Sequence, residues 1–228
     1  PARNLRKNFA NTYLEMRRLL KEEKSAELGE MLKMMEKAKI VRFSENRQFS
    51  LVKFTYLDKT GGIVQDKILT LERAIKGDAR AEKTKKSYSK IKAMLFKLYV
   101  LNQQYIQAII QYNDLRNSEF SESLLPELAP LLEIANAKLR SGEPLKATIK
   151  VDATEITTHY LSRRIFKVDT EEKISFSELR CDDFNVSFDY KKDNLYQLPF
   201  DWNTCRLVIR APEGALLTIS EAAIYDSI

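Results

Sequence analysis

The apolar residues between Lys83 and Leu115 recur at alternating steps of three and four, which keeps them on one stripe of a helix. A second apolar stripe runs beside the first, so this helix is expected to pack against more than one neighbour. No Gly or Pro interrupts the stretch, and we predict one long helix over residues 83–115 as the scaffold of the chain. The first stripe consists of Tyr88, Ile91, Leu95, Leu98, Asn102, Tyr105, Ile109 and Tyr112, and the second of Met94, Leu101, Ala108 and Leu115.

Shorter helical patterns lie on both sides of the long helix. Residues 3–39 follow the helical spacing, with a break at Lys21–Lys24 that fits either one kinked helix or two short ones. Residues 124–139 form a shorter amphipathic pattern with Pro126 in its first turn, where the missing N–H costs nothing. The run Ser141–Pro144 is the clearest boundary in the chain, because it combines Ser, Gly and Pro.

Residues 40–76 have two interpretations. Apolar and polar residues alternate over Val52–Tyr56 and a Gly pair follows, which favours a small β-hairpin near residues 49–64. The alternative is a helix that ends at Gly61. In the last part, residues 66–76, the spacing of the apolar residues favours a helix.

After Pro144 the apolar period changes from helical to two, which is the period of strands with one buried face. Short strands at this spacing, rich in Val, Ile, Thr, Phe and Tyr, predict an antiparallel β-sandwich. The predicted strands are Ala147–Val151, Ile156–Leu161, Ile165–Val168, Lys173–Phe176, Phe184–Tyr190, Arg206–Arg210 and Leu216–Tyr225. The predicted fold class is therefore α+β, with a helical domain over residues 1–141 and a sandwich domain over residues 145–228.

The closing run Leu217–Asp226 resembles the last strand of galactose-binding or discoidin-type jelly rolls, and Arg206–Arg210 is similar to the strand before it. This resemblance covers about a tenth of the chain, and short β patterns recur by chance. It supports a sandwich and does not assign the chain to that family.

The composition fits a globular protein, since 44% of the 228 residues are apolar and 31% are charged. The net charge of +6 is unevenly distributed. Lys and Arg outnumber Asp and Glu by 12 in residues 1–100, whereas the acids exceed the bases by 1 in residues 101–150 and by 5 in residues 151–228. This asymmetry favours two domains with different surfaces.

Both cysteines, Cys181 and Cys205, lie in the acidic last third, and each begins a strand-like run. A cross-strand or inter-sheet disulfide between them would require an oxidising compartment, so we expect a periplasmic or extracellular protein. Two free thiols in a cytoplasmic protein are the alternative. The chain opens with Pro1 and no initiator Met, which fits a cleaved export signal, a lost membrane anchor or a truncated chain. No apolar run approaches the ~20 residues that a membrane helix needs.

Lysines gather on one face of the predicted long helix. Lys83, Lys86, Lys90 and Lys97 form this basic face, which suits nucleic acid, anionic lipid or an acidic polysaccharide. The face is poor in Arg and has no interleaved aromatic residues to stack on bases, so nucleic acid is disfavoured. A solvated helix face is the better interpretation.

The stretch from Asp193 to Asn203 combines aromatic residues with amides and carboxylates in a loop between strands. Tyr196, Gln197, Trp202 and Asn203 are the candidate binding residues, because aromatic faces beside amides are typical of sugar or peptide sites. The alternative is that the large aromatic residues of this stretch plug the end of the sandwich.

Catalytic and cofactor motifs are absent from the sequence. His159 is the only imidazole and lies mid-strand without a nucleophile motif, which favours a structural role. The set Cys181, Cys205 and His159 lacks the spacing of a zinc site, and Gly61-Gly62 lacks the surroundings of a phosphate loop. We therefore expect no metal and no cofactor, and we favour a non-enzymatic protein, although catalytic residues that converge from distant positions of the chain would leave no motif.

The leading functional hypothesis is a non-enzymatic exported binding protein. Its sandwich would recognise a glycan or a protein partner, and its helices would act as a spacer or an assembly surface. An alternative is an intracellular adaptor that associates through the long helix, where Asn102 would specify the register. A further alternative is a membrane-active protein that exposes the predicted hairpin.

Overall fold

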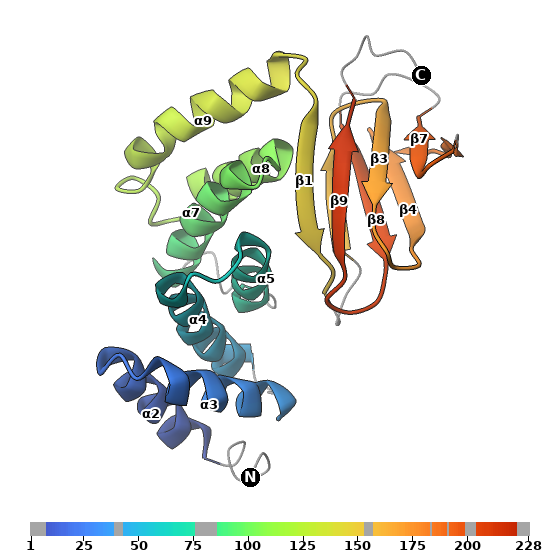
Figure 1. The fold of residues 1–228 in the computed structure, drawn as a ribbon. Coiled ribbons are helices and arrows are strands. Elements are labelled where there is room, and N and C mark those ends of the chain that lie inside the picture. Colours follow the sequence, from blue (N-terminus) through green and yellow to red (C-terminus); the bar gives the residue numbers. More distant parts are fainter. Residues whose placement is uncertain are drawn as a thin grey trace. The chain divides into compact units, whose positions relative to one another are not determined.

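The computed structural model describes residues 8–38, 43–75, 86–152, 157–182, 184–190, 192–198 and 204–222. Helices come first along the chain and antiparallel sheets follow, which confirms the predicted α+β fold class (Figure 1). The chain divides into two compact units, residues 1–91 and residues 92–228, and the division falls within helix α7.

The first unit is helical throughout its described residues. Its helices are α2 (Phe9–Lys21), α3 (Ser25–Lys37), α4 (Phe43–Thr60), α5 (Val64–Ala74) and the first turn of α7 (Lys86–Leu101). The predicted break at Lys21–Lys24 separates α2 from α3, so this region forms two helices. Their apolar faces share one core with α4, made of Phe9, Met16, Leu19, Leu28, Leu32, Met35, Phe49 and Val52.

The β-hairpin predicted near residues 49–64 is wrong, because this segment is helix α4 followed by the start of α5. Phe49, Val52 and Tyr56 lie three and four residues apart, and all three pack in or against the core of the first unit. Gly61 then ends the helix with a φ of 72°, a left-handed conformation that glycine adopts without strain. A short alternation fits both a strand and one side of a helix, and here the shared core decides for the helix.

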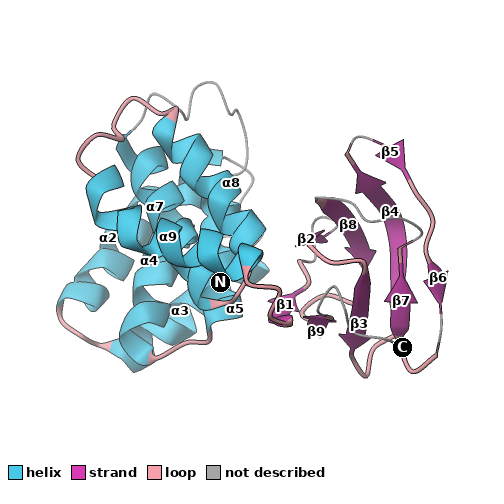
Figure 2. Ribbon diagram, turned by 90° about the horizontal axis from the view of Figure 1, so that it is seen from above, coloured by secondary structure: helices cyan, strands magenta, loops and turns pink. Residues whose placement is uncertain are grey.

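The second unit joins the rest of α7 to α8 (Tyr105–Arg116), α9 (Leu125–Arg140) and two antiparallel sheets (Figure 2). One sheet has the strand order β1-β9-β3-β7-β6, and the other has the order β2-β8-β4-β5. The strands are β1 (Leu145–Lys150), β2 (Thr157–Leu161), β3 (Ile165–Asp169), β4 (Ser175–Cys181), β5 (Phe184–Asn185), β6 (Asp189–Tyr190), β7 (Leu195–Gln197), β8 (Cys205–Arg210) and β9 (Leu216–Glu221).

Helix gives way to strand at Ser141–Pro144, where the sequence places its clearest boundary. The compact units nevertheless divide within α7, so α8 and α9 group with the sheets. The two domains predicted over residues 1–141 and 145–228 stay a prediction.

The core of the sandwich consists of buried residues from both sheets. These are Ile149, Val151, Leu161, Phe166, Val168, Leu179, Cys181, Leu198, Cys205, Leu207, Ile209, Ala215, Leu217 and Ile219. The strand predicted over Phe184–Tyr190 is two short strands in different sheets, β5 and β6. Val186 and Phe188, between them, pack against the core, so the chain crosses from one sheet to the other there.

The single long helix predicted over residues 83–115 is interrupted, because α7 and α8 are separated at residues 102–104. Gln103 has a φ of 59° and ends α7 in the left-handed conformation, although no Gly is present. The Asn102 side chain donates to the backbone carbonyl of Thr148 on β1, with an Nδ2–O distance of 2.8 Å. A hydrogen bond to a residue 46 positions later in the chain thus holds the turn, and the heptad-like pattern does not predict this bond.

The predicted disulfide is confirmed. Cys181 on β4 and Cys205 on β8 lie directly opposite each other in one sheet, with Cα atoms 4.1 Å apart, and they are joined by an S–S bond. Both residues are buried in the core between the sheets. The bond is therefore cross-strand, which is one of the two arrangements that the sequence allows.

Replacing both cysteines by Ala should lower the free energy of unfolding of the sandwich by about 3 kcal/mol, because the disulfide closes a loop of sequence separation 24. Urea unfolding followed by the fluorescence of the single Trp measures this loss. Wild-type protein treated with a reductant is the matched control and should lose the same stability. A Cys181→Ala/Cys205→Ala variant as stable as the oxidised protein would contradict the expectation.

Asn102→Ala should destabilise the second unit by about 1 kcal/mol, since the Thr148 carbonyl loses its donor. Asn113→Ala is the matched control, because Asn113 is an exposed Asn on α8. The same urea titration compares the two variants. If Asn102→Ala unfolds at the same urea concentration as Asn113→Ala, the hydrogen bond from Asn102 to Thr148 contributes nothing to the stability of the second unit.

Candidate functional site

The predicted binding residues lie in different parts of the molecule. Tyr196 and Gln197 belong to β7, whereas Trp202 and Asn203 lie outside the described residues. Successive residues of a strand point to opposite faces. Tyr196 packs against the core, so Gln197 lies on the outer face of the sheet. The two described residues of the prediction therefore do not converge.

Tyr196 belongs to an aromatic cluster between the sheets. Its ring stacks on Phe166, with the centroids 5.2 Å apart, and meets the rings of Phe176 and Phe188 edge-on at 5.1 Å. Edge-to-face and stacked rings stabilise each other beyond the area that they bury. Burial raises the pKa of the Tyr196 hydroxyl. Tyr196 thus helps to close one side of the sandwich.

The outermost ring of this cluster is Tyr190 on β6. It is 58% exposed, and its centroid lies 5.5 Å from that of Tyr196. The cluster therefore supports a ring that is more than half open to solvent. The neighbouring turn, Lys192–Asn194, is exposed and carries an ammonium, a carboxylate and an amide. We call Tyr190, Tyr196 and this turn the aromatic edge.

Sequence reasoning missed Tyr190, because it appears there as the last residue of a predicted strand. Only the pairing of β6 with β7 brings it opposite Tyr196. The outer strands on this side, β5 and β6, have two residues each. Strands this short leave few backbone groups free to pair with another strand. A ligand at the aromatic edge would therefore be held mainly by side chains.

Part of the predicted basic face is present on α7. Lys86, Lys90 and Lys97 are exposed, and none of the three forms an ion pair within the described part of the chain. Lys83 lies outside the described residues. Lys92 is different, since it is buried and donates to Gln111 at 2.8 Å and to Asp114 at 2.9 Å.

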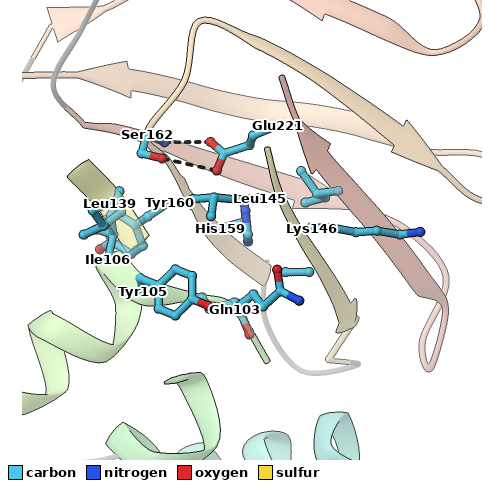
Figure 3. A pocket seen from close by; sticks show the side chains of 13 residues that line it. Gln103, Tyr105, Ile106, Leu139, Leu145, Lys146, His159, Tyr160, Ser162 and Glu221 are labelled. Carbon is cyan, nitrogen blue, oxygen red and sulfur yellow. Dashed lines mark hydrogen bonds between the residues drawn. The ribbon is translucent and has the colours of Figure 1, made fainter. Parts of the chain in front are cut away.

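A second candidate site is a pocket on the other side of the sandwich, where the outer strands β1 and β2 lie next to α8 (Figure 3). The pocket is partly open to solvent and has a volume of about 10 Å³, which is close to the least that one water molecule needs. Its polar lining includes Gln103, Tyr105, Lys146, His159, Ser162 and Glu221.

Glu221, at the end of β9, is a buried acid in this pocket and is only 5% exposed. Its carboxylate accepts hydrogen bonds from the N–H groups of Ser162 and Arg163, at 2.6 and 3.2 Å. It also accepts one from the Ser162 hydroxyl at 3.3 Å (Figure 3). Burial outweighs these bonds and raises the pKa of Glu221 to about 7.

His159 is buried on the same side of the sandwich. It lies opposite the core residue Leu207, and its Nδ1 atom has no hydrogen-bond partner among the described residues. Burial lowers its pKa to about 4, so the imidazole is neutral at pH 7. This residue is thus a buried neutral ring inside the fold.

The pocket brings together Ser162, His159 and Glu221, yet their connectivity is not that of a catalytic triad. In a triad the imidazole bridges the serine hydroxyl and the acid. Here the Ser162 hydroxyl bonds directly to Glu221, while His159 Nδ1 has no partner in the described structure. This arrangement does not activate Ser162 as a nucleophile. No group of three or more His, Cys, Asp and Glu residues in the described part of the chain is placed to hold a metal ion.

The helices of the described segments include none that is long and apolar enough to cross a membrane. The chain matches no known family model, no curated protein and no solved structure. The likeness of Leu217–Asp226 to jelly-roll strands therefore does not extend to a family.

Protonation of Glu221 and of His159 should affect stability with opposite signs. The fold raises the pKa of Glu221 from 4.5 to about 7, so folding favours its protonated form and stability falls as the pH rises from 4.5 to 7. The fold lowers the pKa of His159 from 6.5 to about 4, so stability is lost as the pH falls from 6.5 to 4. Each effect amounts to at most about 3 kcal/mol, and they oppose each other between pH 4.5 and 6.5.

Single variants should separate these two contributions. Relative to wild type, Glu221→Gln should lose stability on acidification below pH 7, and His159→Gln should gain stability below pH 6.5. Urea unfolding at several pH values gives these differences, and Glu213→Gln, at an exposed position, serves as the control. Parallel pH profiles for wild type and both variants would contradict the expectation.

Proposed function

We propose that this chain is a non-enzymatic, exported binding protein whose β-sandwich binds a glycan at the aromatic edge. The observation that carries the proposal is the Tyr190 ring, 58% exposed and supported from behind by Tyr196. Sugars stack on exposed aromatic faces and use nearby polar groups for orientation. The exposed turn Lys192–Asn194 supplies such groups. The helices serve as a spacer or an assembly surface.

A glycan is favoured over a protein partner by what surrounds Tyr190. A peptide that adds a strand to a sheet needs a long free edge, whereas β5 and β6 offer two residues each. Protein interfaces also centre on a continuous apolar patch. On β5, β6 and β7, the large apolar residues that are exposed are Phe184 and Tyr190, one in each sheet. A protein partner remains the second outcome of the test.

Export is supported by the Cys181–Cys205 disulfide, because such bonds persist in oxidising compartments such as the periplasm and the cell surface. The hypothesis of an intracellular adaptor has less support, since the long helix is interrupted and Asn102 bonds to Thr148 of the same chain. The hypothesis of a membrane-active protein required a β-hairpin, and that segment is helix α4.

Tyr190→Ala should abolish glycan binding while the fold survives. The purified chain is first screened on a glycan array, and any hit is then measured by native affinity electrophoresis in gels that contain the corresponding polysaccharide. Trp202→Ala is tested beside it, because Trp202 belongs to the candidate binding residues. Phe184→Ala is the matched control, since Phe184 is 66% exposed and belongs to the other sheet.

Retention that survives in the Phe184→Ala variant and disappears in the Tyr190→Ala variant would support the proposal. Unchanged retention by a folded Tyr190→Ala variant would reject the aromatic edge as the site. A chain that binds no glycan on the array would reject the glycan, and a protein partner would then be the hypothesis to pursue.

A further inference from the structure

The turn between β2 and β3 connects the end of one strand to the end of a helix. The N–H groups of Ser162 and Arg163 donate to the Glu221 carboxylate, at 2.6 and 3.2 Å. The Arg163 guanidinium donates in turn to the carbonyl of Leu139, in the last turn of α9, at 3.2 Å. Carbonyls at the end of a helix have no partner within it, and a cation there is stabilising. Glu221 thus holds the turn, and the turn holds the helix end.

Arg163 is a buried cation whose backbone N–H donates to the Glu221 carboxylate. It is 6% exposed, and its Nε atom has no hydrogen-bond partner among the described residues. Its guanidinium donates to the neutral carbonyls of Ser162 and Leu139. Its side chain forms no ion pair within the described part of the chain, so Glu221 acts on Arg163 through the backbone of the turn. Hydrogen bonds to a charged acceptor are stronger than those to a neutral one, so the position of the turn, and with it that of the Arg163 guanidinium, depends on the ionisation of Glu221.

The other charged or titratable groups around this pocket do not replace Glu221, which is the one acid among the lining residues. On β2 the neutral imidazole of His159 lies in the interior, and on β1 the Lys146 side chain is exposed. The groups beyond these are Tyr105 on α8 and, after α9, Glu143, which pairs with Lys138 at 2.9 Å.

We propose that the Glu221 carboxyl is a proton-controlled latch between the sandwich and the end of α9. With the carboxylate charged, Arg163 stays buried and bonds to the Leu139 carbonyl. When the carboxyl binds a proton from solvent, its hydrogen bonds to the N–H groups of Ser162 and Arg163 weaken, the turn shifts, and the Arg163 guanidinium releases that carbonyl. The raised pKa of Glu221, about 7, means that this change occurs near neutral pH.

The latch has a signature that a purely structural carboxylate lacks. Protonation relieves the burial of a charge, so the global free energy of unfolding rises as the pH falls through 7. The same proton loosens the end of α9 by removing its tie to Arg163. Acid therefore raises the global free energy of unfolding and at the same time loosens this helix end. A general loss of packing would lower the global stability and loosen the helix end together.

Hydrogen–deuterium exchange of the full chain at pH 8.5 and pH 5.5 tests the latch. Exchange in the segment 138–146, divided by the intrinsic rate at each pH, should be about tenfold faster at pH 5.5, which corresponds to one charge-assisted hydrogen bond. Glu221→Gln should exchange at the fast rate at both pH values. Arg163→Met should also lose the pH response, because it has no guanidinium to release. Glu213→Gln, the exposed control, should behave as wild type.

A wild-type protein with equal corrected exchange at both pH values would overturn the proposal. A pH response that persists in Glu221→Gln or in Arg163→Met would overturn it as well, since another group would then be responsible. If a variant does not fold, the comparison of wild-type exchange at the two pH values still tests the latch. The midpoint of the exchange change must coincide with the titration of the Glu221 carboxyl followed by ¹³C NMR, and separate midpoints would reject the latch.

Discussion

The structure of the second unit depends on closing the core between its two sheets. The inward faces of both sheets are fully apolar at their centre, and the buried disulfide lies among them. An open sandwich has two sides where this core would meet water, at β1 and β2 on one side and at β5 and β6 on the other. Different side chains close the two sides. Aromatic rings close the side that carries the aromatic edge, and polar groups and helices close the side that carries the pocket with Glu221.

On the side of β5 and β6 the closure is aromatic. Phe166, Phe176, Phe188 and Tyr196 fill the space between the sheets, and Tyr190 covers them from outside. Rings suit this place because they bury large areas and order few rotatable bonds. The last ring of such a cluster necessarily keeps one part in water. A closure made of aromatic residues therefore also presents an aromatic surface, at Tyr190.

On the side of β1 and β2 the outer strands are six and five residues long, and edges of this length need a cover. The helices supply it, and the contacts to them include hydrogen bonds from Asn102 to Thr148 and from Arg163 to Leu139. Buried polar groups at the margin of a core need hydrogen-bond partners, and the Glu221 carboxylate accepts from the N–H groups of Ser162 and Arg163. The closure on this side therefore contains a buried acid, while the aromatic closure consists of Phe and Tyr rings.

The sequence by itself determined the features that local patterns encode. The change of period after Ser141–Pro144 marks the transition from helix to sheet, and the two cysteines in strand-like surroundings favour a disulfide over free thiols. In the structure Cys181 ends β4, Cys205 begins β8, and the two are bonded. The tertiary structure decided what local patterns leave open. A short alternation over Val52–Tyr56 became helix because a shared core buries one side of it, and a heptad-like pattern broke at Asn102 because a strand 46 residues away binds its side chain. Likewise burial between the sheets and the helices raises the pKa of Glu221, and its carboxylate bonds to Ser162, 59 residues earlier. No periodicity predicts a contact between residues so far apart in the chain.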